Sequence, residues 1–127
     1  MSDFIRAAEY GDLDKVKVML TTDRSLVTRR DAGNNTALHQ AAAFGHEAIV
    51  EALLSWGATV DPQSHAGTTP LLTACQEGHL ACVLALLKAG ASVSLPNNEG
   101  SLPVHIAAEH NKVEIVRTLL DFGCSPD

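Results

Sequence analysis

The chain has 127 residues, 46% of them hydrophobic but only 4% aromatic, so its core is expected to consist of packed aliphatic helices rather than a β-sandwich. A net charge of −6 argues against a phosphate-tracking nucleic-acid surface, and the sequence contains no apolar run long enough to span a membrane. The three cysteines, Cys75, Cys82 and Cys124, form no dense framework, so we expect no disulfide and a soluble protein of the cytoplasm and/or nucleus.

The charges are distributed unevenly along the chain. Residues 1–30 contain six basic and five acidic residues, whereas residues 31–127 contain three basic and ten acidic ones. No basic residue lies between Arg30 and Lys88. Most of the chain therefore has a negative field, which favours a protein partner with a basic surface.

The first predicted element is a helix pair between Phe4 and Leu20. The motif positions that define it are Ala7-Ala8, Gly11 and Val16-x-x-Met19-Leu20. The same motif positions recur three more times along the chain, although the segment from Thr21 to Arg30 contains one extra residue before the next copy. A pattern that repeats in this way indicates a repeat protein.

The three later copies are related by a shift of 33 residues. Each has a short helix-start motif, then a Val-x-x-Leu-Leu motif, then a glycine at Gly57, Gly90 or Gly123. The aligned helix starts are Thr36 to Ala42, Thr69 to Cys75, and Leu102 to Ala108. We therefore expect one domain over residues 1–127, with repeats at approximately 1–30, 31–63, 64–96 and 97–127.

Each copy predicts two short helices joined by a tight turn. Thr69-Pro70 is typical of a helix start, because the threonine hydroxyl caps the helix and proline needs no N–H at the first position. Glycines are expected to adopt left-handed conformations at helix ends. Where the pattern lacks glycine it has asparagine, at Asn34 and Asn111, and asparagine tolerates that conformation next best.

These motifs resemble those of the ankyrin-repeat family. The resemblance rests on TALHQAA, TPLLTAC and LPVHIAA, each followed by a Leu-Leu pair and a glycine, and it covers nearly the whole chain. It extends distantly to the small, myotrophin-like ankyrin proteins. It implies an all-α repeat solenoid of helix-turn-helix pairs with hairpin-like turns. It also implies a non-enzymatic module that binds a protein partner through its concave face and turn tips.

The cysteines and histidines are interpreted as parts of this scaffold. Cys75 and Cys82 align with small or apolar core positions, where cysteine packs as a small hydrophobe. The resemblance implies that His39 and His105 bond to neighbouring turn backbone. No spacing typical of a zinc site, no phosphate loop and no nucleophile motif is present. We therefore predict no metal, no cofactor and no enzymatic activity.

Partner contacts are predicted where the copies differ although the scaffold does not require it. Aromatic residues in the first two repeats suggest an apolar contact, and acidic residues in the last two suggest a contact with a basic partner. Packing between helices, or covering of a turn, is an equally good interpretation of the aromatic residues. The predicted partner-binding residues are Tyr10, Phe44, Trp56, His65, Gln76, Glu77, Asn98, Glu99, Glu109 and His110.

The fourth repeat departs from the pattern in two ways. Leu102 stands where Thr36 and Thr69 cap the earlier helices, so we expect this repeat to fray first. Its second helix also lacks an obvious polar capping repeat after it, which indicates either a fragment of a longer protein or an exposed edge that pairs. We expect a monomer unless that edge pairs. An alternative function is the N-terminal regulatory domain of a larger enzyme or channel.

Overall fold

The computed structural model describes residues 3–123, and within this range all regular structure is helical. The first helix of each pair belongs to one layer and the second helix to the other. A single 3₁₀ helix, η1, follows the first pair. The elements are α1 (Asp3–Tyr10), α2 (Leu13–Thr22), η1 (Arg24–Thr28), α3 (Ala37–Ala43), α4 (Glu47–Ser55), α5 (Pro70–Glu77), α6 (Leu80–Lys88), α7 (Pro103–Glu109) and α8 (Val113–Asp121).

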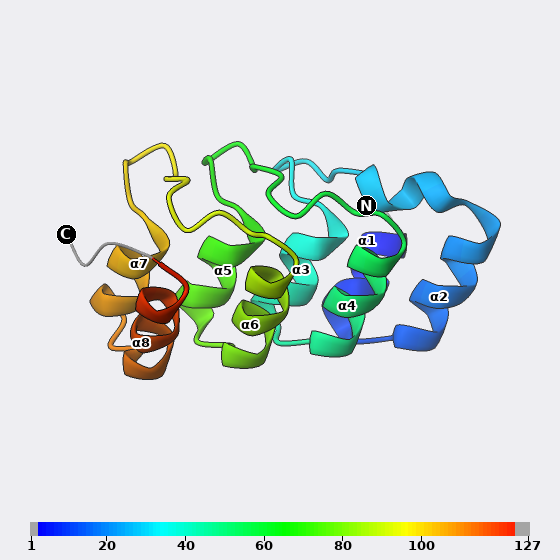
Figure 1. Ribbon diagram of the computed structural model, residues 1–127. Helices are drawn as coiled ribbons and strands as arrows, with labels where there is room; N and C mark the ends of the chain where they lie inside the picture. The colour runs from blue at the N-terminus through cyan, green and yellow to red at the C-terminus, as the bar shows by residue number, and fades with distance from the viewer. Residues whose placement is uncertain (1–2, 124–127) are drawn as a thin grey trace.

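The helix pairs stack side by side into a solenoid. Helices α1, α3, α5 and α7 pack against one another in order, and α2, α4, α6 and α8 form the second layer. The long turns that connect one pair to the next lie together along one edge, and the short turns within each pair lie along the opposite edge (Figure 1). The predicted all-α repeat solenoid is confirmed.

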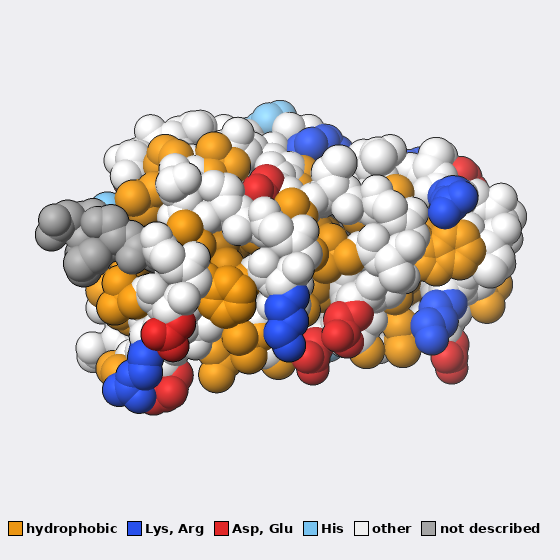
Figure 2. All heavy atoms as spheres, viewed as in Figure 1, with side chains coloured by type: hydrophobic (Ala, Val, Ile, Leu, Met, Phe, Trp, Pro, Cys, Tyr) orange, Lys and Arg blue, Asp and Glu red, His pale blue; other side chains and the backbone are white. Residues whose placement is uncertain are grey.

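The core lies between the two layers and between neighbouring pairs. Alanines on the first helices, such as Ala8, Ala41 and Ala74, are completely buried, because the helices approach closely there. On the second helices the apolar stripe points inward, as Val50, Leu53 and Leu86 show. The outer face that Figure 2 shows carries hydrophobic side chains between helices and charges of both signs along its lower margin.

The helix ends adopt the left-handed conformations that the sequence predicts. Gly45 and Gly78 have φ values of 77° and 81°. Asn34 and Asn111, which replace glycine, have φ values of 65° and 61°, so the prediction is confirmed. Gly45 is needed for space as well, since a Cβ on it would lie 2.7 Å from Nδ1 of His79. An alanine at this position would therefore disturb both the backbone and the next repeat.

The helix starts differ among the repeats as expected. The hydroxyl oxygens of Thr36 and Thr69 accept hydrogen bonds from backbone N–H groups three residues later. Leu102 offers no such acceptor, and α7 has no side-chain cap. The Leu102 N–H itself donates to Nδ1 of His105 at 3.3 Å. Helix α7 therefore retains the counterpart of one of the three hydrogen bonds that join Thr36 and His39 at the start of α3.

The extra residue between the first and second repeats lies in η1, which sequence reasoning did not predict. Asp23 begins this helix, and its Oδ1 accepts from both the backbone N–H and the hydroxyl of Ser25. These hydrogen bonds lower the pKa of Asp23 below its usual value. The guanidinium of Arg24 then lies 5.6 Å from the centre of the Trp56 ring.

Candidate functional site

The tips of the long turns are tied to one another by hydrogen bonds. The N–H of His65 donates to the carbonyl of Gly33 at 3.0 Å, and the N–H of Asn98 donates to the carbonyl of Ala66 at 2.9 Å. The side-chain amide of Asn98 also donates to the His65 carbonyl at 2.8 Å. The predicted contact residue Asn98 is therefore part of the scaffold, and its amide holds two tips together.

Side chains below the tips add a second set of links, which sequence reasoning missed. A guanidinium N–H of Arg30 donates to the Gln63 carbonyl at 3.0 Å, and the amide of Gln63 donates to the Pro96 carbonyl at 3.4 Å. The sequence offered a signal for these links, because Arg30, Gln63 and Pro96 occupy equivalent positions at successive intervals of 33 residues. Together the two sets of links give the tip edge a fixed shape, from which the exposed side chains of His65 and Glu99 project.

His39 connects the second repeat to the third, as the family resemblance implied. Its Nδ1 accepts from the Thr36 N–H at 3.0 Å, so its Nε2 carries the proton and donates to the Thr68 carbonyl at 2.7 Å. The imidazole is buried, and this desolvation lowers its pKa, although the Thr68 carbonyl favours the charged form. The neutral ring is therefore the form that the fold selects.

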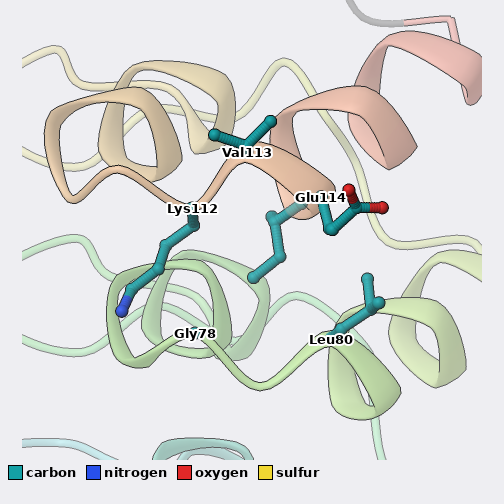
Figure 3. Close-up of a pocket in the computed structure, with 6 residues that line it drawn as sticks. Gly78, Leu80, Lys112, Val113 and Glu114 are labelled. Atoms are coloured by element: carbon teal, nitrogen blue, oxygen red, sulfur yellow. The ribbon is translucent and has the colours of Figure 1, made fainter.

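His46 and His79 make equivalent links at the opposite edge. Nε2 of His46 donates to the Glu9 carbonyl at 2.9 Å, and Nε2 of His79 donates to the Ala43 carbonyl at 3.1 Å. Each ring thereby joins the start of the second helix of one repeat to the end of the first helix of the repeat before it, α4 to α1 and α6 to α3. One repeat later the side chain of Lys112 lies over Gly78 instead (Figure 3). Gly78 and Lys112 contribute to the lining of a pocket of about 310 Å³.

Four of the predicted contact residues occupy one structurally equivalent position. Tyr10, Phe44, Glu77 and His110 end the first helices, and each immediately precedes a residue with positive φ. All four are exposed, Tyr10 at 71% and Phe44 at 53%. We call these four residues the terminal row. Gln76 and Glu109 are exposed one residue before two of its members.

Trp56 lies apart from the terminal row. It ends α4, and because the two helices of a pair are antiparallel, it lies at the opposite edge from Phe44. Its ring is half-buried, packs against the core and carries Arg24 over one face. The structure therefore brings Tyr10 and Phe44 to one edge but not Trp56, and it likewise separates Glu99 at the tips from Glu77 and Glu109.

The remaining chemistry-bearing groups are part of the packing. Cys75 and Cys82 are buried, and burial raises the pKa of the Cys82 thiol to about 11. Cys124 lies outside the described residues. Over residues 3–123 no group of three or more His, Cys, Asp or Glu side chains is arranged to hold a metal. No helix in that part of the chain is long and apolar enough to cross a membrane.

Comparisons with known proteins agree with this architecture. A family model described as ankyrin repeats (3 copies) matches residues 4–64 and 57–127. A stretch of 63 residues, 50% of this chain, is 44% identical to the 26S proteasome non-ATPase regulatory subunit 10 of Mus musculus. Over 71 residues each, 56% and 55% of this chain, identity is 35% to the putative ankyrin repeat protein YahD of Escherichia coli (strain K12) and 38% to the E3 ubiquitin-protein ligase XB3 of Oryza sativa subsp. japonica. The chain spans only 27%, 35% and 16% of these relatives' lengths, respectively.

Proposed function

Because the chain belongs to the ankyrin-repeat family, we propose that it is a non-enzymatic protein-interaction module. The observation that carries this proposal is the exposure of the terminal row, together with the turn-tip side chains of His65 and Glu99, on a scaffold whose repeats are hydrogen-bonded to one another. Exposed aromatic residues on a rigid support are the usual anchors of protein interfaces. We take residues 1–127 as a single interaction domain of four repeats.

The proposed partner is a protein with a basic surface. Glu77 and Glu109 lie exposed near the ends of neighbouring first helices, and Glu99 lies exposed at a turn tip. Past Arg30 the chain has three basic and ten acidic residues, so its field attracts a cationic partner and repels nucleic acid. The buried thiols suit the reducing cytoplasm or nucleus.

Affinity capture from cell extract with mass spectrometry tests this proposal. The bait is compared with a terminal-row variant, Tyr10→Ser with Phe44→Ser and Glu77→Lys, and with a matched control on the second helices, Val18→Ser with Glu51→Lys. Circular dichroism and urea unfolding establish that all three are folded. We expect the same proteins to be retained by the original chain and the control and lost by the row variant. Capture of one identical set by all three baits would contradict the proposed face.

A second candidate function is an N-terminal regulatory ankyrin domain within a larger enzyme or channel. Two observations favour it. The relative XB3 is named as a ubiquitin ligase, and the chain spans 16% of its length. In addition, some side chains of the last pair are exposed although the equivalent side chains of earlier pairs are covered by the next repeat. His105, for example, is exposed, whereas its counterpart His39 is buried. The full-length reading frame decides between the two candidates, because an enzymatic or channel domain in the same frame supports the second.

A further inference from the structure

The terminal row has a regular pitch that hydrogen bonds hold in place. The His46 ring bonds to the carbonyl of Glu9, which precedes Tyr10, while His46 itself lies two residues after Phe44. The His79 ring makes the same bond to Ala43, which precedes Phe44, while His79 lies two residues after Glu77. The first three row members, Tyr10, Phe44 and Glu77, are therefore tied through the ends of the helices that carry them.

The pitch of the row matches an extended polypeptide. The first helices pack directly on one another, and packed helices have axes about 8–10 Å apart. An extended chain in the polyproline II conformation advances about 3.1 Å per residue and completes one turn in three residues, so its side chains at every third position point to the same side. A polyproline II segment lying along the row therefore passes one row member with about every third residue, and its side chains at those positions all face the row.

The chemistry of the row changes along its length. Its first two members, Tyr10 and Phe44, form an exposed aromatic pair, whereas Glu77 presents a carboxylate. Nδ1 of His110 donates to the Ile106 carbonyl at 2.9 Å, and the residue is exposed beside Glu109. One end of the row therefore suits apolar side chains and the other end suits hydrogen-bond donors.

The charged residues around the row also differ between its two ends. Glu109 is exposed one residue before His110, whereas Arg6 lies one helical turn before Tyr10. Lys112 is the cation nearest in sequence to the acidic end, and its side chain lies over Gly78, half-buried. The carboxylates of Glu77 and Glu109 outnumber the single cation of Lys112, so a basic side chain is favoured beside them and disfavoured beside Arg6.

We propose that the terminal row binds an extended segment of a partner protein that carries two apolar residues and one Lys or Arg at three-residue intervals. The apolar residues lie against Tyr10 and Phe44, and the basic residue pairs with Glu77. This inference rests on the proposed function and specifies the partner's binding segment. The interval follows from the pitch of the stack, and the order of residues follows from the order of the row.

Selection from a displayed library of random 12-residue peptides tests the inference directly. We expect enriched peptides to carry apolar residues at positions i and i+3 and Lys or Arg at i+6, read in one chain direction. The Glu77→Lys variant is expected to select an acidic residue at the third position, and Tyr10→Ser with Phe44→Ser is expected to lose the apolar preference. The Val18→Ser, Glu51→Lys control keeps the original preference.

Fluorescence polarisation then measures the spacing itself. A peptide with the selected residues moved to two-residue intervals is expected to bind about tenfold more weakly, a difference of about 1.4 kcal/mol. Equal binding of both peptides, or an unchanged preference in Glu77→Lys, overturns the inference. Failure to enrich any peptide, when affinity capture from extract still retains proteins at this face, also overturns it. Failure of the capture experiment itself overturns the proposed function instead.

Discussion

One repeat position shows how the same residue takes different roles at different places in the stack. His39, Leu72 and His105 are equivalent, 33 residues apart. His39 and Leu72 are buried, and the His39 ring bonds to the next turn, whereas His105 is exposed and, among residues 3–123, accepts from the start of its own helix. The free energy that a histidine contributes here depends on whether another repeat covers it.

Replacing His39 by Leu, the residue of the third repeat, is expected to cost about 1–3 kcal/mol, because the buried Thr36 N–H loses its side-chain acceptor and the Thr68 carbonyl keeps only the Ser64 N–H of its two donors. The matched change His105→Leu is expected to alter the free energy of unfolding by less than about 0.5 kcal/mol, since that ring is exposed. Urea unfolding followed by circular dichroism measures both. Equal losses in the two variants would show that the inter-repeat bond of His39 contributes nothing.

His39 also makes stability depend on pH in a definite direction. Burial lowers its pKa in the folded chain below the ordinary value of about 6.5, so the unfolded chain binds more protons in mild acid. Its contribution to stability is fully present above that ordinary value and is lost as the pH falls below it.

We therefore expect the urea midpoint to fall between about pH 7.5 and about pH 5, and to fall less in His39→Leu. The His105→Leu variant serves as the control and should keep the original slope. A slope in His39→Leu as steep as that of the unmodified chain would exclude His39 as the source.

Among the elements, the first helices differ mainly at their starts. The capping hydroxyls of Thr36 and Thr69 are buried, and α5 gains a proline at its first position as well. Helix α7 keeps the proline but has Leu102 in place of the capping residue. The His105 N–H in the first turn of α7 therefore has no side-chain acceptor at position 102.

Changing Leu102 to Thr is expected to stabilise the protein by about 0.5–1 kcal/mol, because it supplies the missing cap. Leu102 packs partly against the core, and the threonine methyl retains some of that contact. The reverse change, Thr69→Leu, is expected to cost about 1 kcal/mol or more. Urea midpoints measure both, and a loss of stability in Leu102→Thr would mean that the apolar contact outweighs the cap.

For the whole molecule, the two ends of the stack are unequal. In the first pair Phe4, Val16 and Leu20 are buried, whereas in the last pair Leu120 is 39% exposed although its counterpart Leu87 is only 6% exposed. Repeat proteins gain stability from each neighbour, so an end with exposed apolar residues is the weaker one. The fold leaves this face uncovered from α7 to α8 within residues 3–123.

Amide hydrogen exchange is expected to be fastest in α7 and α8, intermediate in α1 and α2, and slowest in α3 to α6, because local opening follows the number of covering neighbours. Mass spectrometry of peptic fragments measures the order. Faster exchange in α1 and α2 than in α7 and α8 would contradict the expectation that the more completely buried first pair is the more stable of the two.

Much of the fold follows from local chemistry, and local chemistry can be interpreted from sequence. Glycines or asparagines at left-handed positions, threonine caps and the recurring Leu-Leu pairs predict the helix pairs and their ends, which the structure confirms. The extra turn of η1 could not be predicted, because its sequence, RSLVT, belongs to no repeated pattern.

The composition of the candidate site could be predicted, but its grouping could not. Divergence among aligned copies identified Tyr10, Phe44 and Glu77 without any coordinates. The same reasoning placed Trp56 with the aromatic pair, whereas the antiparallel course of each helix pair puts it at the other edge.

The repeat length, the helix pairs, the family resemblance and the sign of the electrostatic field can all be predicted from sequence, because they depend on residues close together in the chain or on composition alone. Which residues of different repeats become neighbours follows only from the way the helix pairs stack. The hydrogen bonds of Asn98, Gln63 and His79 to other repeats join residues about 33 positions apart, and their geometry exists only once the pairs have stacked. The same stacking brings Tyr10, Phe44, Glu77 and His110 into one row, because equivalent positions of consecutive repeats lie side by side once the repeats pack against one another.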